Sequence, residues 1–219
     1  MTGKMPAVLV TGFEPFDGEA INPSQEIART LDGETIAGHR VIGATLPTEF
    51  ARSLDTLEEL IRMHRPALVI AFGLAGGGTG ISLERVAINL IDARIADNAG
   101  DQPVDVVVVE NAPNAYFSTL PIKAMLARLR AADIPAAISH SAGTFVCNQV
   151  FFGLAHLLAT QHPRVRGGFV HVPWLSEQAA RHARAPHMPR EQMLAAARLC
   201  LETALTTPAD VHYAAGTLQ

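Results

Sequence analysis

Cys147 occupies a position that favours a reactive thiol. It follows a glycine-containing stretch, residues 139–146, and begins a segment with the apolar spacing of a helix, residues 147–160. Free amide groups and the positive end of a helix dipole favour the thiolate, which is the nucleophilic form of cysteine. A lone cysteine is more often a buried structural residue, and we expect this of Cys200, which has leucines around it in the sequence.

A nucleophilic cysteine needs a base within hydrogen-bonding reach, and His171 is the best-placed imidazole. It lies at the end of a short apolar run, residues 168–172, whereas most other histidines fall in predicted helices or connecting loops. His140, which is close to Cys147 in the sequence, is the alternative base. Taken alone, His171 is equally well explained as a core histidine with satisfied hydrogen bonds, so its expected proximity to Cys147 carries the argument.

A third group usually orients such a base, and Glu84 is the candidate. This carboxylate interrupts a strand-like apolar run, residues 81–91. A buried carboxylate is unfavourable unless it is paired, which makes Glu84 suitable for orienting an imidazolium. An ion pair with Arg85, or a solvent-facing position on a strand, explains Glu84 as well.

Other chemistries have weaker support in the sequence. Residues 139–143 (SHSAG) resemble a nucleophile elbow without its first glycine, so a serine hydrolase that uses Ser141 is the alternative enzyme. The glycine-rich residues 73–80 lack the lysine of a phosphate-binding loop, and we expect their amides to receive an oxyanion or carbonyl instead. Metal catalysis has still weaker support, because no HExxH or CxxC pattern is present.

Strand-like and helix-like segments alternate along the chain and predict the α/β class. The expected strands are residues 7–11, 41–46, 67–72, 136–139 and 168–172, and the expected helices are residues 24–31, 48–63, 121–132, 147–160 and 190–206. We therefore expect a mostly parallel twisted sheet with helices on both faces. Ligands in such sheets bind beyond the carboxyl ends of the strands, where the candidate residues fall.

Residues 81–115 break this alternation. A strand-like run, residues 81–91, is followed by a polar loop, residues 92–103, and by a second apolar run, residues 104–110. This order predicts a hairpin or an edge-strand excursion.

Composition limits the possible partners and location. The 219 residues are 48% hydrophobic and 17% charged, which suits a single domain over residues 1–219. A net charge of -4 with scattered lysines and arginines argues against nucleic acid as a partner. No apolar run reaches the roughly 20 residues of a membrane-spanning helix and no signal peptide is evident, so we expect a cytoplasmic protein without a disulfide.

Around the candidate residues Glu84, Cys147 and His171, the sequence resembles the pyroglutamyl peptidase I family, also called pyrrolidone-carboxylate peptidases. The resemblance covers nearly the whole chain, from VLVTGFEPF at residues 8–16 and INPS at residues 21–24 to VHVP at residues 170–173. Two segments are specific to the family, namely the glycine loop running into SLERVAIN at residues 82–89, and SHSAGTFVCN at residues 139–148.

The resemblance implies a cysteine exopeptidase that removes an N-terminal pyroglutamyl residue from peptides. It implies that Glu84, Cys147 and His171 form a catalytic triad and that the reaction proceeds through a thioester acyl-enzyme. It also suggests one α/β domain, no metal or organic cofactor, a cytosolic location and often a homotetramer. One position departs from the pattern, because many members have an arginine where this chain has Gly78, and that role is then absent or moved to Arg85 or Arg94.

The expected substrate group is a flat, neutral lactam, so its pocket should be apolar with a few directed hydrogen bonds. The resemblance suggests that Phe13 and Phe16 sandwich the ring, although either could simply close the core. Asn22 is a weaker candidate because Asn-Pro-Ser is also an ordinary helix start. We expect Leu74 and Val146 to complete the substrate site. A non-catalytic protein that binds pyroglutamyl peptides remains the alternative outside the enzymes.

Overall fold

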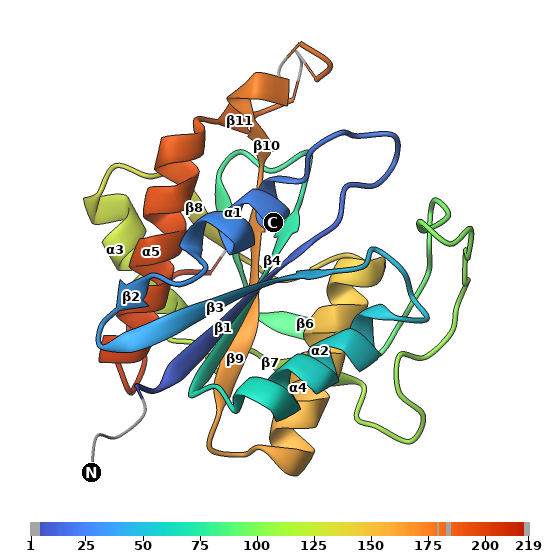
Figure 1. Cartoon of the computed structure of the whole chain (residues 1–219), viewed down its shortest axis with the longest axis horizontal. Coiled ribbons are helices and arrows are strands. Elements are labelled where there is room, and N and C mark those ends of the chain that lie inside the picture. The colour runs from blue at the N-terminus through green and yellow to red at the C-terminus, as the bar shows by residue number, and fades with distance from the viewer. Residues whose placement is uncertain (1–4, 179, 183–184, 217–219) are drawn as a thin grey trace.

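The computed structural model describes residues 5–178, 180–182 and 185–216, and its centre is a seven-stranded sheet (Figure 1). Its strands are β1 (Ala7–Phe13), β2 (Thr35–Ile36), β3 (His39–Leu46), β4 (Leu68–Leu74), β5 (Ile81–Glu84), β8 (Ala136–Ser139) and β9 (Arg166–Val172), in the spatial order β2-β3-β1-β4-β9-β5-β8. β3, β1, β4 and β9 are parallel, whereas β2, β5 and β8 run in the opposite direction. The expected α/β class with a mostly parallel sheet is confirmed.

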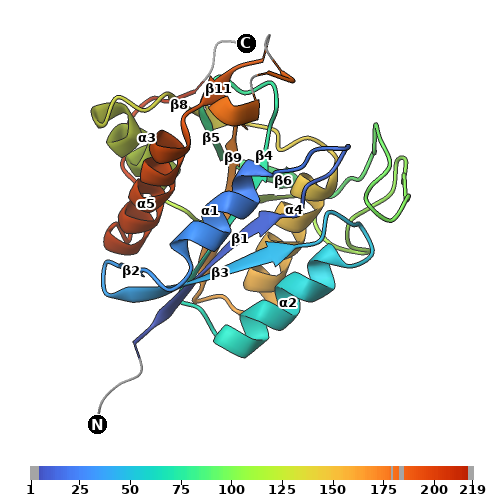
Figure 2. The same cartoon turned by 45° about the horizontal axis from the view of Figure 1, so that its top comes forward.

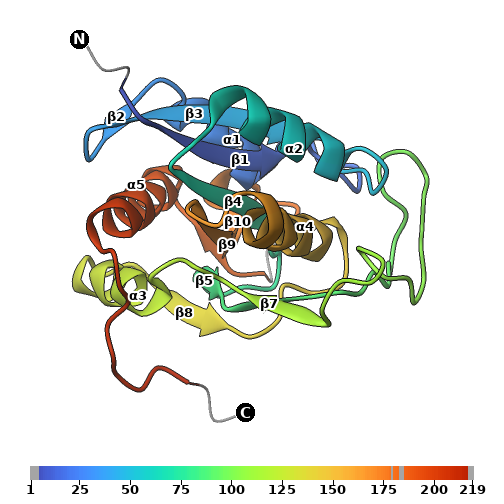
Figure 3. The same cartoon turned by 90° about the horizontal axis from the view of Figure 1, so that it is seen from below.

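Helices cover both faces of the sheet. The helices are α1 (Pro23–Leu31), α2 (Ser53–His64), α3 (Ile122–Ala131), α4 (Val146–Gln161) and α5 (Arg190–Thr206). α1, α3 and α5 lie on one face, and α2 and α4 lie on the other (Figures 2 and 3). None of the helices in the described part of the chain combines the length and hydrophobicity that a bilayer crossing requires.

The protein has two hydrophobic cores, one on each face of the sheet, because successive side chains of a strand point to opposite faces. In β1, Val8 and Val10 pack under α1 and α5, whereas Leu9 packs against α2 and α4. Each face of the central strands is therefore apolar, which is why these strands appear in the sequence as continuous apolar runs rather than alternating ones.

Residues 81–115 form the expected hairpin-like or edge-strand excursion only in part. β5 lies inside the main sheet, between β9 and β8, and β6 (Val86–Ile88) pairs with the distant β7 (Ala115–Phe117) in a separate ribbon. The apolar run at residues 104–110 is not a strand. It forms only an isolated bridge from Val106 to Ile91, because Asp105 has a φ of 53° that interrupts an extended chain.

Three further elements are too short for periodicity to predict. β10 (Trp174–Leu175) pairs with β11 (His187–Met188), and one 3-10 turn, η1, spans Ser176–Gln178. They lie beyond the carboxyl end of β9 (Figure 1).

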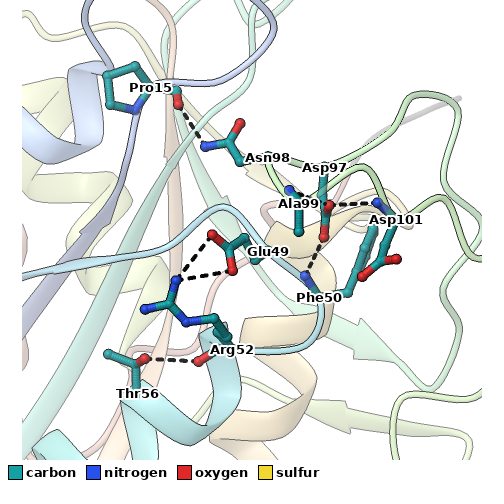
Figure 4. A network of polar contacts seen from close by, with 9 residues as sticks. All are labelled: Pro15, Glu49, Phe50, Arg52, Thr56, Asp97, Asn98, Ala99 and Asp101. Carbon is teal, nitrogen blue, oxygen red and sulfur yellow. Dashed lines mark hydrogen bonds and ion pairs between the residues drawn. The ribbon is translucent and has the colours of Figure 1, made fainter.

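The helix expected over residues 48–63 begins only at Ser53, because a loop holds the residues before it (Figure 4). The amide of Asn98 donates to the carbonyl of Thr48 at 3.0 Å, and the amide of Phe50 donates to Oδ2 of Asp97 at 2.7 Å. These contacts with residues 97–101 override the helical spacing of the sequence.

Asp97 is the centre of this contact. Its buried carboxylate accepts backbone N–H groups from Phe50, Ala99 and Asp101, the last two at 2.9 Å on Oδ1 (Figure 4). The side chain of Asn98 also donates to the carbonyl of Pro15 at 3.0 Å. The loop therefore ties together the segments that follow β1 and β3.

Replacing Asp97 by Asn should destabilise the protein by about 1.5–3 kcal/mol, the usual range for a buried hydrogen bond to a charged group. An Asn side chain can keep the two bonds on Oδ1, but its amide group would face the N–H of Phe50 donor to donor. Urea unfolding measures the loss. Asp101→Asn changes the same charge in the same loop without a side-chain bond to lose, and should stay within about 0.5 kcal/mol of the parent. Equal effects of the two substitutions would contradict this account.

Candidate active site

Strand alternation places the candidate base and carboxylate on the face that α2 and α4 cover. In β9 the residues on either side of His171 pack under α1, α3 and α5, so the imidazole points to the opposite face. In β5, Ile81 and Leu83 pack into the same core as those neighbours, so Glu84 faces the same way as His171. The antiparallel pairing of β5 with β9 brings the two side chains together.

Glu84 and His171 form a buried hydrogen bond. Nδ1 of His171 donates to Oε1 of Glu84 at 2.8 Å, and the exposed fractions of the two side chains are 7% and 2%. A carboxylate can only accept, so the bond fixes a proton on Nδ1 and leaves Nε2 for another partner. The two alternatives for Glu84, an ion pair with Arg85 or a solvent-facing position, do not match this geometry.

The charge state of His171 follows from its neighbours. Burial lowers the pKa of His171, but hydrogen bonds to Cys147 and Glu84 and the charges of those groups together raise that pKa to about 10. A pKa raised in this way favours the protonated imidazole at neutral pH.

Cys147 is the second residue of α4, and its thiol lies against a glycine. Gly73 in β4 pairs with His171 in β9. A Cβ added to Gly73 would lie 2.9 Å from Sγ of Cys147 and 2.7 Å from the ring of Phe169, both too close. The missing side chain at Gly73 is what allows the thiol to lie beside the imidazole.

Two buried amide side chains fix the first turn of α4. Asn148 accepts from the amide of Ile88 at 3.1 Å and donates to the carbonyls of Ile88 and Leu90 at 2.9 Å. Gln149 donates to the carbonyl of Phe50 at 2.8 Å. The residues directly after Cys147 are thus tied to both neighbouring segments.

The amide groups at the start of α4 are available to an anion. Phe145 is the N-cap residue and makes no side-chain cap, and the first helical bond runs from the amide of Gln149 to the carbonyl of Phe145 at 3.1 Å. Within the described residues no partner is found for the amides of residues 146–148. Such amides are suitable donors to an oxyanion.

A cavity of about 330 Å³ opens in front of these groups. It is lined by Phe13, Phe16, Asn22, Thr48, Leu74, Ala75, Ser82, Glu84, Ser139, Ser141, Ala142, Gly143, Phe145, Val146, Cys147 and His171. All the residues expected in the catalytic and substrate sites therefore line one space. Among the lining residues only Glu84, Cys147 and His171 are titratable.

Aromatic rings form much of the cavity wall. Phe13 is buried, with its ring centroid 6.2 Å from that of Phe169. Phe16 lies 6.1 Å from Phe145, which makes an edge contact with Phe50 at 5.2 Å. The sequence did not single out Phe145 or Thr48. The available signal for Phe145 was its position two residues before the helix expected over residues 147–160.

Asn22 touches the cavity, but its polar atoms serve the fold. Its Oδ1 accepts from the amide and the hydroxyl of Ser24, at 3.1 and 2.8 Å, and its Nδ2 donates to the carbonyl of Glu14. The hydroxyl of Ser24 in turn accepts from the amide of Phe13 at 3.0 Å. Asn22 thus caps α1 and holds the residue that carries the Phe13 ring.

The alternative nucleophile and base are poorly placed. Ser141 is exposed, its hydroxyl accepts from the amide of Gly143 at 3.2 Å, and no histidine in the described residues bonds to it. His140 is exposed and lies outside the cavity lining. Cys200 is buried in α5, and burial raises its pKa to about 12, which suits an inert core thiol.

The two arginines considered for Gly78 lie in different places. Arg94 lines a cleft together with Gly76 and Gly77, whereas Arg85 lines a separate hollow near Lys123. Only Arg94 is therefore beside the glycine segment. No group of three or more His, Cys, Asp or Glu side chains that could hold a metal ion occurs in the described parts of the chain.

Glu84→Gln should lower the pKa of His171 from about 10, because the carboxylate that stabilises the imidazolium is removed while the side-chain shape is kept. NMR titration of histidine-labelled protein measures this pKa directly. Glu34→Gln, which breaks a remote 2.7 Å pair with Arg198, is the matched control and should leave the titration of His171 unchanged. An unchanged pKa in Glu84→Gln would show that Glu84 does not hold the charge.

The chain is similar to known proteins in both sequence and fold. A family model described as pyroglutamyl peptidase matches residues 6–207. A pyrrolidone-carboxylate peptidase of Cupriavidus taiwanensis is 54% identical over 216 residues, covering 98% of this chain and 100% of the relative. A crystal structure of Bacillus amyloliquefaciens pyroglutamyl peptidase I has a TM-score of 0.91 at 41% identity, covering 94% of this chain and 100% of that chain. A mutant pyrrolidone carboxyl peptidase from Pyrococcus furiosus has a TM-score of 0.89 at 44% identity, covering 91% and 98%. The chain therefore belongs to the pyroglutamyl peptidase family and is a cysteine-type peptidase, as its sequence resemblance implied.

Proposed function

We propose that the protein hydrolyses the amide bond after an N-terminal pyroglutamyl residue and releases pyroglutamic acid and the shortened peptide. The observation that carries the proposal is the cavity itself. Cys147, His171 and Glu84 are its only titratable residues, and they are grouped together, so the rest of the wall is neutral.

This wall suits a lactam better than an ordinary N-terminus. An ammonium group would lose its hydration without gaining a free counter-charge, because the Glu84 carboxylate is already paired with His171. A neutral lactam ring avoids this penalty. Phe13 and Phe16 would flank the ring, and Leu74 and Val146 would close the pocket around it.

The first chemical step is attack by the Cys147 thiolate on the pyroglutamyl carbonyl carbon. A carbon–sulfur bond forms, and the carbonyl electron pair moves to oxygen. The amides at residues 146–148 would stabilise this oxyanion. They are better placed than the glycine segment, where the amides of Ala75 and Gly78 already donate to backbone carbonyls at 2.9 Å.

The intermediate then collapses to a thioester. The carbon–nitrogen bond breaks, and the leaving nitrogen takes the proton from Nε2 of His171. Water next attacks the thioester and gives a proton to the now neutral imidazole. The carbon–sulfur bond breaks, pyroglutamic acid leaves, and the thiolate–imidazolium pair is restored.

Glu84 acts through His171 as a positioning residue. Its bond to Nδ1 fixes the ring so that Nε2 faces the thiol, and its charge favours the protonated imidazole.

The activity is tested with chromogenic amides of pyroglutamate, proline and alanine. We expect turnover of the pyroglutamyl amide alone. Cys147→Ala should lower kcat by about 10³-fold or more, because the nucleophile is lost. Cys200→Ser is the matched thiol control and should keep nearly full turnover.

Three results would contradict the proposal. Retained activity in Cys147→Ala, with a fluorophosphonate label on Ser141, would indicate a serine hydrolase. Binding of a pyroglutamyl peptide that mass spectrometry finds uncleaved would indicate a non-catalytic protein. Cleavage of the prolyl or alanyl amide at a similar rate would remove the argument from the neutral wall.

We also infer a cytoplasmic location and self-association as a homotetramer. Both cysteines are free thiols, which fits a reducing compartment. Four large apolar residues are exposed in β7 or in the segment between β6 and β7, namely Val104, Val106, Val107 and Phe117. Contact between copies would cover them. Sedimentation velocity should show a tetramer that Val104→Asp and Val107→Asp weaken; a monomeric parent protein would refute the assembly.

A further inference from the structure

A second cleft adjoins the catalytic cavity. Its volume is about 420 Å³, and it shares two walls with the cavity, Phe16 and Leu74. Its other walls include Trp174, Ile95 and the glycine segment at residues 76–77. The two spaces are therefore neighbours that meet at the shared residues.

Trp174 is the largest side chain of this cleft, and it is held in place. It lies three residues after His171, beyond the carboxyl end of β9. A Cβ added to Gly76 would lie 2.6 Å from Nε1 of the indole, so the ring packs directly against the glycine backbone. His182 stacks on the indole with ring centroids 3.8 Å apart and 6° between planes, and its Nε2 lies 3.1 Å from the Glu19 carboxylate.

The path of a bound peptide follows from the chemistry. When the lactam ring lies in the cavity and the scissile carbonyl carbon attached to the ring lies at Cys147, the leaving nitrogen must lie near His171. The residue that carries this nitrogen then lies outside the cavity. The second cleft is the adjoining space. Trp174, which lines it, lies three residues after His171 in the protein.

We propose that this cleft binds the residue that follows pyroglutamate, and that Trp174 packs against its side chain. The inference rests on the proposed function and adds a leaving-side specificity to it. Trp174, Ile95 and the shared walls are apolar, so the cleft should favour large apolar or aromatic residues. Arg94 and Asp17 contribute one charge of each sign, which gives no net preference for a charged residue.

Three substrates separate the cleft from the cavity. Pyroglutamyl-phenylalaninamide places an aromatic residue in the cleft, pyroglutamyl-glycinamide places only backbone there, and pyroglutamamide, which releases ammonia, places nothing there. We expect the parent enzyme to have a higher kcat/KM for the phenylalanine substrate than for the glycine substrate.

Trp174→Ala should lower kcat/KM for the phenylalanine substrate about tenfold and leave pyroglutamamide within about twofold. Trp174→Phe should recover most of the loss, and it also keeps the test valid if the alanine variant folds poorly. Met63→Ala removes an exposed apolar side chain on α2, away from the cleft, and should change none of the three values.

An equal loss on all three substrates would mean that Trp174 only supports the fold, and no loss on any would mean that the cleft is unused; either result overturns the inference. If the parent enzyme cleaves none of the three, the proposed function itself fails. If it cleaves pyroglutamamide and both peptides alike, the proposed function stands and the leaving-side preference fails.

Discussion

The hydrogen bond between Glu84 and His171 is the interaction on which the site depends. Both side chains are almost fully buried, and each would be strongly unfavourable there without the other. The bond also requires a particular sheet. β5 enters beside β9 in the reverse direction, so that a carboxylate from the neighbouring strand can meet the imidazole on one face. The change of strand direction between β9 and β5 therefore coincides with the position that needs a partner for His171.

The same pairing determines what the cavity can select. Because the charge of Glu84 is paired with His171 and the remaining oxygen, Oε2, is buried, the one carboxylate in the cavity wall offers no unpaired charge to an ammonium group. Selection for a neutral group then comes from the desolvation penalty on a charged one and not from a dedicated charge contact. Shape and aromatic walls supply the rest, as is usual for small-molecule pockets.

Much of this arrangement could be predicted from the sequence, because continuous apolar runs identify buried strands such as β1, β4 and β9 and place His171 at a strand end. The direction and partners of β5 could not, since a strand-like run carries no information about pairing. The start of α2 was predicted too early because Asp97, distant in the sequence, competes for the amide of Phe50. Asn22 shows the reverse case, where the ordinary reading as a helix cap is correct, since its Oδ1 accepts from the amide of Ser24.

The position of the nucleophile depends on residues that take no part in the chemistry. Phe50 donates its amide to Asp97, accepts at its carbonyl from Gln149, and packs its ring against Phe145. Gln149 and Phe145 lie on either side of Cys147 at the start of α4. Phe50, in the segment that follows β3, therefore connects the loop at residues 97–101 to the first turn of α4, which carries the thiol. A loop that looks peripheral in the sequence is in this way part of the framework that fixes the distance between thiol and imidazole, so loosening it would affect reactivity as well as stability.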